Sequence, residues 1–492
     1  MSVTSLLFLF LTFIAALIFR RLPQKYRLPW VLLVSALFLA TWNWVFVLVL
    51  SVFGAANYWL GFKVEQSIST AKRGWLVGGI IFNILVLFIF KYNHFFLPSF
   101  IQLIGVQSNN SALQILLPVG LSFLVVQMIS YLVDVANKRL PAERNLIHFG
   151  VYTLYFPKLI SGPVERARTF LPRLQTPLPF DRALLDRSLS LIVIGFLRKL
   201  VFANPLFNII PEAAFTNPLD FPGQNLWLYL LAYAFALFND FAGYTGIVRG
   251  ISLWFGIELS SNFNLPYFSR NFTEFWNRWH SSLSAWLRDY LFFPISRSLM
   301  KRFSRRDHFL TLFVPPMATM LVSGLWHGVS WSLLVWGGLH GIYQVLERLP
   351  GLFRPSPPLD ERPRSRQLLG MGVTFFLTLL AWIPFRMDLP TSFQFFQGLF
   401  KFVRPDFFLF KRYITGDAPF LSWTPLNLPN PLLVLLLAAA LGFDLLLARK
   451  SGEKDFWGIP RWVQVILIVI LLIAALATIF VDVAAPFVYQ AF

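Results

Sequence analysis

The sequence predicts an all-α polytopic membrane protein. Of its 492 residues, 57% are hydrophobic and only 13% are charged, whereas about 25% of the residues of an average soluble domain are charged. Several apolar stretches approach or exceed the roughly 20 residues that cross a hydrocarbon core about 30 Å thick. The basic residues fall in short clusters between these stretches, which is typical of helices oriented by the positive-inside rule.

The charge balance and the missing cysteines exclude several classes of function. The net charge of +19 would suggest nucleic-acid binding in a soluble protein, but its clustering between apolar runs indicates membrane orientation instead, with no nucleic-acid partner. The chain contains no cysteine, which rules out disulfides, thiolate metal sites and a cysteine-bound acyl intermediate.

The first apolar stretch, residues 6–19, is short and precedes Arg20 and Arg21. A signal peptide would have a basic region before the stretch and a small-residue cleavage site after it. Neither pattern is present, so we expect a retained first helix.

The remaining elements follow from placing every basic cluster inside the cell. The clusters are Arg20 to Arg27, Lys63 to Arg73, Lys138 to Arg173, Arg297 to Arg306, Arg348 to Arg366 and Arg449 to Arg461. The predicted path has two passes within 29–60, single passes near 74–96, 112–136, 186–204 and 226–256, a hairpin or re-entrant pair at 309–346, and single passes at 366–388, 431–449 and 461–482. This gives roughly ten to twelve transmembrane or re-entrant helices. We expect one membrane domain over residues 1–492, with an inner segment at 257–308 and an outer loop at 389–430.

The inner segment contains an amphipathic pattern that begins at Asn271. With a helical period, the following apolar side chains occupy an arc of about 120°: Phe272, Phe275, Trp276, Trp279, Leu283, Trp286, Leu287 and Tyr290. Asn271 followed by Glu274 resembles a helix start. We therefore expect an interfacial helix that runs to about residue 294 and lies at headgroup depth. His280 falls just beyond the edge of the apolar stripe and faces protein, either as a hydrogen-bonded structural residue or as part of a site.

His327 lies near the middle of the predicted hairpin, where an imidazole is at membrane depth. It is a satisfied core histidine, a haem or metal ligand, or a catalytic base, and ionisable groups at such depth usually mark a pathway or a reaction centre. The small residues Ser323, Gly324 and Gly328 leave room for a ligand chain or close backbone approach, and Trp326 can line a slot.

Other catalytic signatures are missing. The chain has no P-loop, no H-E-x-x-H motif and no G-x-S-x-G elbow. No acidic or histidine ligands flank the histidines in a metal-binding spacing, so we expect no metal site. His340 lies on the second arm of the hairpin, where we expect a structural role.

Five motifs together resemble the membrane-bound O-acyltransferase family, most closely its bacterial alginate-acetylation and D-alanyl-transfer branch. They occur in the family's order over about residues 116–345: LLPVGLSFLVVQMISYLVDV at 116–135, FPKLISGPVER at 156–166, NDFAGYTGIVRGISLWFGIELSSNFNLPYFSRNFTEFW at 239–276, WNRWHSSLSAWLRDYLFFP at 276–294 and SGLWHGVSWSLLVWGGLHG at 323–341.

The resemblance implies transfer of an acyl group from a thioester to a hydroxyl, inside a central tunnel. It assigns His327 as the essential histidine and His280 as the second family histidine. Histidine is well suited to take a hydroxyl proton at neutral pH. The residues expected to contact the substrates are Trp326, Trp279, Ser282, Arg278, Tyr244 and Ser323.

The expected co-substrate is an acyl thioester, acetyl-CoA or an acyl carrier protein, with no bound cofactor. The resemblance further implies a cell-envelope polysaccharide, a glycolipid or a partner protein as acceptor, an extracytoplasmic acetyltransferase as partner, and a multi-pass location in the inner or plasma membrane. Two other functions remain open from the sequence: an exporter or flippase of lipid-linked sugars, and a membrane scaffold for a cell-surface synthase. The hairpin holds no acidic residue before Glu347, which disfavours a charge-relay transporter.

Overall fold

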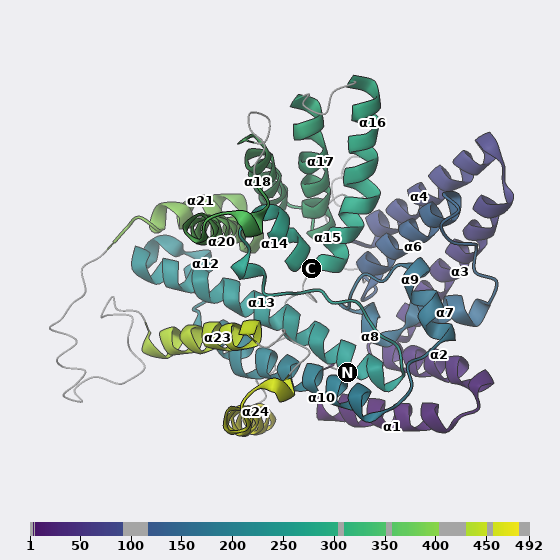
Figure 1. The fold of residues 1–492 in the computed structure, drawn as a ribbon, viewed down its shortest axis with the longest axis horizontal. Helices are drawn as coiled ribbons and strands as arrows, with labels where there is room; N and C mark the ends of the chain where they lie inside the picture. Colours follow the sequence, from purple (N-terminus) through teal and green to yellow (C-terminus); the bar gives the residue numbers. More distant parts are fainter. Residues whose placement is uncertain are drawn as a thin grey trace, which may run out of the picture.

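The computed structural model describes residues 3, 5–91, 117–303, 309–350, 357–402, 430–449 and 456–481. Within these ranges the chain forms helices joined by turns and loops, and no strand (Figure 1). The predicted all-α fold is therefore confirmed.

Seven helical stretches in the described part of the chain are long and apolar enough to cross a membrane. They are Trp44–Gln66, Ser69–Lys91, Arg182–Ile209, Gly223–Trp254, Phe309–His327, Arg364–Arg386 and Pro431–Ala448. Two shorter apolar helices, Leu121–Ala136 and Arg461–Ala477, add to them. The chain is a multi-pass membrane protein.

The N-terminal helices gather at one side of the molecule (Figure 1). They are α1 (Leu6–Arg21), α2 (Gln24–Ala40), α3 (Trp44–Gln66) and α4 (Ser69–Lys91). The segment 29–60, in which a pair of passes is expected, contains most of α2 and most of α3, joined by residues 41–43; of these two helices, α3 alone is among the seven stretches long and apolar enough to cross a membrane. Asn43 caps α3, because its side chain accepts a hydrogen bond of 2.9 Å from the backbone N–H of Val45, and this satisfies one of the free donors at a helix start.

The middle of the chain surrounds one long helix, α13 (Gly223–Trp254), which crosses the centre of the view in Figure 1. Before it come α6 (Leu121–Ala136), α7 (Leu146–Leu154), α8 (Phe156–Leu159), α9 (Ala167–Gln175), α10 (Arg182–Phe196), the π-helical segment η1 (Leu197–Ala203), α11 (Asn204–Ile209) and α12 (Ala213–Thr216). The passes expected near 186–204 and 226–256 are thus confirmed as α10 with η1 and as α13.

Charged side chains hold η1 inside the bundle. Arg198 donates to the side chains of Asn239 on α13 and Asp444 on α23 (Pro431–Arg449), each at 2.8 Å. Lys199 pairs with Asp240, also on α13. All of these side chains are buried, as expected where a charge at membrane depth must meet an opposite charge or a hydrogen-bonding group.

The expected hairpin at 309–346 is confirmed as α17 (Phe309–His327) and α18 (Trp331–Arg348), with a three-residue turn. In Figure 1 its open end stands beside α16 (Phe293–Phe303), and its tip points toward the centre of the molecule. Ser330 caps α18 by accepting from the backbone N–H of Leu333 at 3.2 Å. The hairpin thus carries residue 327 on its tip.

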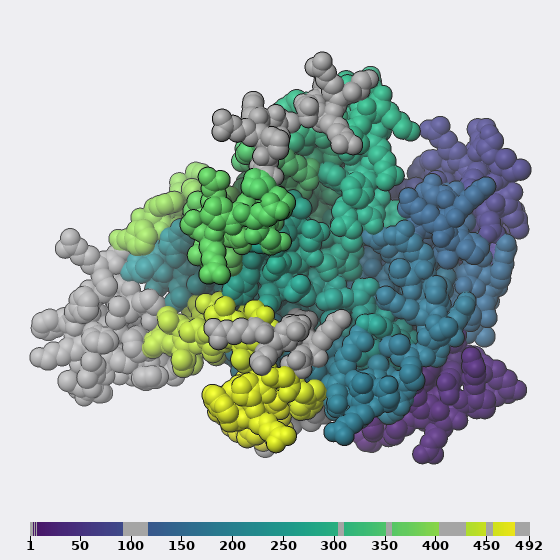
Figure 2. Space-filling model, viewed as in Figure 1, coloured from purple at the N-terminus to yellow at the C-terminus, as the bar shows by residue number. Residues whose placement is uncertain are grey.

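The remaining helices are α20 (Arg364–Arg386), α21 (Leu389–Gly398), α23 and α24 (Arg461–Val481). Helix α21 occupies the start of the expected outer loop at 389–430, whose residues 403–429 lie outside the described residues. In the space-filling view, α24 (yellow) lies on a different part of the surface from the N-terminal helices in purple (Figure 2).

Candidate active site at the hairpin tip

His327 is the last residue of α17 and is buried, with 4% of its surface exposed. Three aromatic side chains surround its ring. The ring centroids lie 5.0 Å from Trp326, 5.1 Å from Trp336 on α18 and 5.3 Å from Phe385 on α20. The imidazole therefore has apolar walls on several sides, where water is scarce and electrostatic interactions are strong.

A cavity of about 160 Å³ reaches His327. We call it the tip cavity, and its lining consists of Trp42, Lys91, residues 117–123, Ile160, Trp326 and His327. These residues come from the α2–α3 turn, the end of α4, the start of α6, the residue after α8 and the tip of the hairpin. Segments far apart in the sequence thus meet around one imidazole.

His280 interrupts the helix that the sequence predicts from Asn271. The structure has two short helices instead, α14 (Phe272–Arg278) and α15 (Ser281–Leu287), so a single helix over this segment is wrong. The backbone of His280 has φ = 41°, in the left-handed region, which non-glycine residues seldom adopt and which recurs at functional sites. The predicted start is confirmed: Asn271 accepts from the Glu274 N–H at 2.7 Å.

This break turns His280 into the protein, where 1% of its surface is exposed. Its ring lies 4.8 Å from Phe241, 6.1 Å from Phe123 and 6.2 Å from Trp326. Burial lowers the pKa of His280 to about 3, so the imidazole is neutral at pH 7 and retains a nitrogen lone pair.

Trp326 lies between the two histidines. Its ring centroid is 6.2 Å from His280 and 5.0 Å from His327. Its indole N–H donates to the backbone carbonyl of Ser122 at 3.2 Å, which fixes the ring against the start of α6. The two histidines of the sequence motifs therefore pack against one oriented indole, although only His327 lines the tip cavity.

The small residues of the SGLWHG motif serve helix packing. A Cβ atom on Gly324 would lie 2.3 Å from the carbonyl oxygen of Leu333, and one on Gly337 would lie 2.4 Å from that of Met320. Both distances are far below van der Waals contact. Of the two uses predicted for Gly324, the structure therefore supports close backbone approach within the hairpin. A Cβ on Gly328 would likewise meet the Leu333 side chain, at 2.8 Å.

Two other predicted contact residues, Trp279 and Ser282, have structural neighbours. Trp279 is buried in an aromatic cluster, with centroids 4.9 Å from Trp382 and 5.2 Å from Phe263. The Ser282 hydroxyl lies 2.5 Å from the side-chain oxygen of Asn262, to which it donates, and accepts from the Val164 N–H at 2.9 Å. Neither residue lines the tip cavity.

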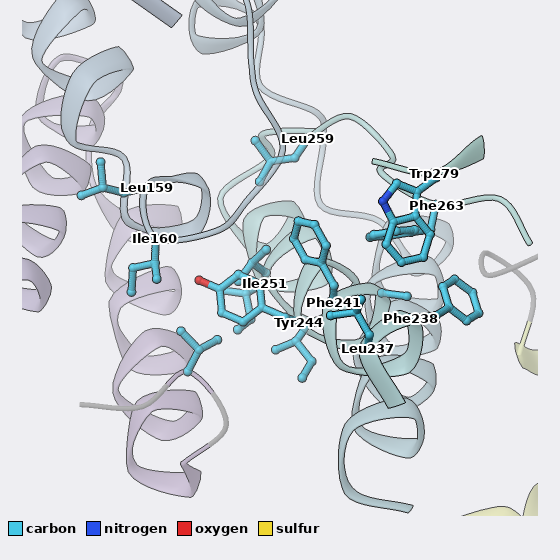
Figure 3. Close-up of a cluster of buried hydrophobic side chains, with 14 of the residues drawn as sticks. Leu159, Ile160, Leu237, Phe238, Phe241, Tyr244, Ile251, Leu259, Phe263 and Trp279 are labelled. Atoms are coloured by element: carbon cyan, nitrogen blue, oxygen red, sulfur yellow. The ribbon is translucent and has the colours of Figure 1, made fainter. Parts of the chain in front are cut away.

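Tyr244 is part of the buried hydrophobic cluster around α13. Figure 3 shows its ring among apolar side chains, with the hydroxyl directed toward Ile160. The hydroxyl interacts electrostatically with the backbone of Ser161, next to a residue that lines the tip cavity. Tyr244 therefore supports the cavity wall from behind.

Arg278 and Ser323 complete the predicted set. Arg278 donates to Glu274 at 2.7 Å on α14. Ser323 is 1% exposed and lies one turn before His327 on α17; its hydroxyl makes no hydrogen bond to the described residues. The structure thus brings Ser323, Trp326, His280 and His327 to one region, and it places Arg278, Trp279, Ser282 and Tyr244 around it.

The motif at 156–166 forms a buried polar loop beside the tip cavity. Lys158 donates to the side chain of Gln127, and Glu165 accepts from the Ser260 N–H at 2.5 Å. Burial lowers the pKa of Lys158 to about 7 and raises that of Glu165. These contacts tie the loop to α6 and to the segment before α14.

A second cavity, of about 260 Å³, lies farther toward the open end of the hairpin. We call it the arm cavity. Its lining combines apolar rings with basic groups: Thr273, Trp276, Asn277, Ser284, Leu287, Arg288, Phe292, Phe293, Thr319, Met320, Gln344 and Arg348. Trp336 packs between the lining residue Trp276, at 6.0 Å, and His327, at 5.1 Å.

Three residues beside His327 are not among the site residues predicted from the sequence. Trp336 and Phe385 contact the imidazole ring, and Lys91 lies at the cavity wall. The helical spacing of Trp336 and His340 on α18 was a usable signal for the first of them. Phe385 and Lys91 belong to other passes, so only the tertiary fold reveals them.

Comparison with known proteins agrees with this geometry. The family model for the membrane-bound O-acyltransferase family matches residues 136–387. The chain is 33% identical over 465 residues to the probable alginate O-acetylase AlgI of Azotobacter vinelandii, covering 92% of this chain and 85% of that protein. It is 30% identical over 402 residues to the peptidoglycan O-acetyltransferase of Helicobacter pylori, covering 75% and 73%.

The name of a third relative refers to a different acyl transfer. The teichoic acid D-alanyltransferase of Bacillus subtilis is 30% identical over 274 residues, which cover 54% of this chain and 68% of that protein. The family model spans the loop with Lys158, the break at His280 and the hairpin with His327. These matches, together with the fold, show that the chain belongs to the membrane-bound O-acyltransferase family.

Proposed function

We propose that this chain moves an acetyl group from a cytoplasmic thioester to a hydroxyl of a cell-envelope polysaccharide or glycolipid, with His327 as the general base. The observation that carries this proposal is the position of His327 at the wall of the tip cavity, on the tip of a hairpin whose arms flank a second cavity. The tip cavity reaches the imidazole directly, whereas Trp336 lies between the imidazole and the arm cavity, so the proposal requires the acyl chain of the donor to pass this side chain.

The tip cavity suits the acceptor. On the path set by the positive-inside rule, the α2–α3 turn, the end of α4 and the start of α6 all face outside. The lining from these segments includes Trp42 and Lys91, and the hairpin adds Trp326. Indole rings offer flat apolar faces against which sugar rings pack.

The arm cavity suits the donor. It lies toward the end of the hairpin that adjoins the basic clusters at 297–306 and 348–366, which the same rule places inside. Arg288 and Arg348 line it together with apolar rings. Guanidinium groups bind phosphate oxygens well, and both acetyl-CoA and the phosphopantetheine arm of an acyl carrier protein present phosphates beside an apolar chain.

The chemistry at His327 requires no covalent intermediate on the protein. The neutral imidazole takes the proton of the acceptor hydroxyl as its oxygen attacks the thioester carbonyl. The tetrahedral intermediate then collapses, the carbon–sulfur bond breaks, and the leaving thiolate receives the proton from the imidazolium. Holding both reactants in one water-poor passage supplies proximity. His280, which packs against Trp326, assists by positioning or polarising the thioester.

The names of the relatives support an envelope polymer as the acceptor. Alginate, peptidoglycan and teichoic acid are all hydroxyl-bearing polymers of the cell surface, and the names of these relatives refer to them. An extracytoplasmic acetyltransferase partner and a location in the inner or plasma membrane complete the proposal, because such a polymer is reached from the outer face.

The experiment compares His327→Ala with the wild type in inverted vesicles. An extracted envelope glycan is enclosed in the vesicle lumen, which corresponds to the outer face, and radiolabelled acetyl-CoA or acetylated carrier protein is supplied in the medium. The wild type transfers label to the glycan, whereas the variant, folded and present at equal level, transfers none. His148→Ala is the matched control, since His148 lies outside both cavities, beside Glu143 at 4.0 Å.

Retained turnover in His327→Ala contradicts the assignment of the base. Movement of unmodified sugar lipid across the vesicle membrane, without acyl transfer, would instead establish the exporter function. Mass spectrometry of surface glycans from cells with and without the intact gene identifies the acceptor by the loss of one acetyl ester.

A further inference from the structure

Lys91 reaches from one helix to the end of another. It is the last residue of α4, and its ammonium group donates hydrogen bonds to two backbone carbonyls at the end of α17, those of Trp326 at 2.6 Å and His327 at 3.0 Å. The last carbonyls of a helix have no partner within the helix. A cation there satisfies them and interacts favourably with the negative end of the helix dipole.

The same ammonium group faces the tip cavity. Lys91 and His327 both line it, and the Lys91 nitrogen lies 5.7 Å from the centroid of the Trp326 ring. A lysine within a membrane helix is costly and commonly functional. Here the ammonium group contacts Trp326 and His327, the two residues of the SGLWHG motif that line the cavity.

The position of the imidazole depends on the end of α17. The backbone N–H of Gly328 donates a hydrogen bond of 3.2 Å to the carbonyl oxygen of Gly324. The chain then turns within three residues into α18. The carbonyls of Trp326 and His327 point out of this end and are held by Lys91. Fraying of the last helical turn would move the backbone that carries the imidazole.

We propose that Lys91 is a positioning residue for the reaction: by holding the carbonyls of Trp326 and His327, it fixes the end of α17 and thereby the orientation of the His327 imidazole toward the tip cavity. This inference rests on the proposed acyl transfer at His327. A displacement of about 1 Å of a catalytic group lowers a rate by about 100-fold, so a clamp of this kind acts on turnover more than on substrate binding.

The test compares Lys91→Met, which keeps the chain length but removes the charge and the donors, with Lys91→Arg, which keeps both. In Lys91→Met, kcat falls about 100-fold while KM for donor and acceptor stays within about threefold. Lys91→Arg recovers kcat to within about tenfold of the wild type. A purely structural contact between α4 and α17 would not produce this split with rescue by arginine.

Lys63→Met is the matched control. Lys63 belongs to the neighbouring helix α3, and its side-chain nitrogen lies 5.4 and 5.9 Å from the ring centroids of Trp59 and Trp75. The substitution therefore also removes an ammonium group beside tryptophan. The kcat of Lys63→Met stays at the wild-type value. Equal loss in Lys63→Met and Lys91→Met would overturn the inference, because the effect would then follow from any lost lysine.

Two further outcomes decide the inference, and a third decides the proposed function. A folded Lys91→Met protein with kcat within threefold of the wild type overturns it while an inactive His327→Ala variant keeps the proposed function intact. If Lys91→Met does not remain monodisperse in detergent, Lys91→Arg alone decides: an arginine variant that is folded and as inactive as His327→Ala refutes the positioning role. An active His327→Ala variant refutes the proposed function itself.

Discussion

The imidazole of His327 lies edge-on against the indole of Trp336, with ring centroids 5.1 Å apart and an interplanar angle of 87°. Trp336 is 1% exposed and also packs against His340 at 5.1 Å and Phe385 at 5.2 Å. It belongs to the second arm of the hairpin, so each arm supplies one side of the contact. The orientation of His327 thus depends on how the two arms pack.

Replacement of Trp336 tests this contact. Trp336→Ala removes the wall beside His327, and we expect acyl transfer to fall about 100-fold because the imidazole is no longer held. The same change costs about 3–5 kcal/mol of stability. Trp336→Phe retains a ring and keeps most of the activity. Rates are measured per amount of folded protein in the acetyl-transfer assay.

Trp331→Ala is the control for this prediction. Trp331 is the first residue of α18 and is 72% exposed, so its loss leaves the wall beside His327 unchanged. An inactive Trp331 variant, or a fully active Trp336→Ala variant, would contradict the role given to the aromatic wall.

Gly324→Ala is expected to open the hairpin. The added Cβ would lie 2.3 Å from the carbonyl oxygen of Leu333, and this backbone atom can move only if α17 and α18 separate. We expect the variant to lose most of its activity. Its free energy of unfolding should fall by about 1–3 kcal/mol, the usual cost of overpacking, and its melting temperature should fall with it. Circular dichroism melts in detergent and the transfer assay measure the two effects.

Gly338→Ala provides the matched comparison on the other arm. A Cβ at Gly338 meets no atom within 4 Å, so the change keeps the packing and gains up to about 1 kcal/mol from higher helix propensity. If both alanine variants behaved alike, the hairpin contact at Gly324 would not be the cause of the loss.

The sequence predicts the hairpin because hydrophobicity and basic clusters are properties of single segments. It places His327 at the tip for the same reason. The break at His280 was not predictable, because the apolar periodicity continues through it and only tertiary packing rewards the left-handed backbone. Trp279 was expected at the substrates, but it packs against Trp382, a partner more than a hundred residues away that periodicity cannot reveal.

The role of Lys91 shows a similar limit. Its position at the end of an apolar stretch is visible in the sequence, but its two carbonyl partners lie on another helix. Small residues near a candidate histidine also have two readings, space for a ligand or close backbone packing. At Gly324 the distance to Leu333 decides for packing.

His280 makes stability depend on pH. Burial lowers its pKa to about 3, while histidine in an unfolded chain titrates near about 6.5. Between these values the unfolded state binds a proton that the folded state does not, so stability falls as the pH drops from 7 to 5. This residue contributes up to about 1.4 kcal/mol per pH unit. In His280→Gln, the melting temperature falls less over the same range.

Ser281→Ala separates this effect from general destabilisation. The Ser281 hydroxyl donates to the carbonyl of Ser261 at 2.6 Å, so its loss lowers the melting temperature by a similar amount at every pH. A His280→Gln protein that retained the full pH dependence of the wild type would show that other groups cause it.

The ion pair between Arg198 and Asp444 fastens α23 to the core. Both side chains are buried, at 2.8 Å between the guanidinium nitrogen and the carboxylate oxygen. Asp444→Asn removes the negative charge from beside Arg198 at membrane depth, and we expect a loss of about 3–5 kcal/mol in stability. The double variant Arg198→Met with Asp444→Leu regains most of this stability, because no buried charge remains at this position.

Glu212→Gln is the control for this prediction. It breaks the pair with Arg386, in which the glutamate side chain is 69% exposed, and costs under about 1 kcal/mol. Thermal unfolding of the four proteins in one detergent measures these differences, and equal melting temperatures for Asp444→Asn and Glu212→Gln would show that α23 is held by its apolar contacts alone.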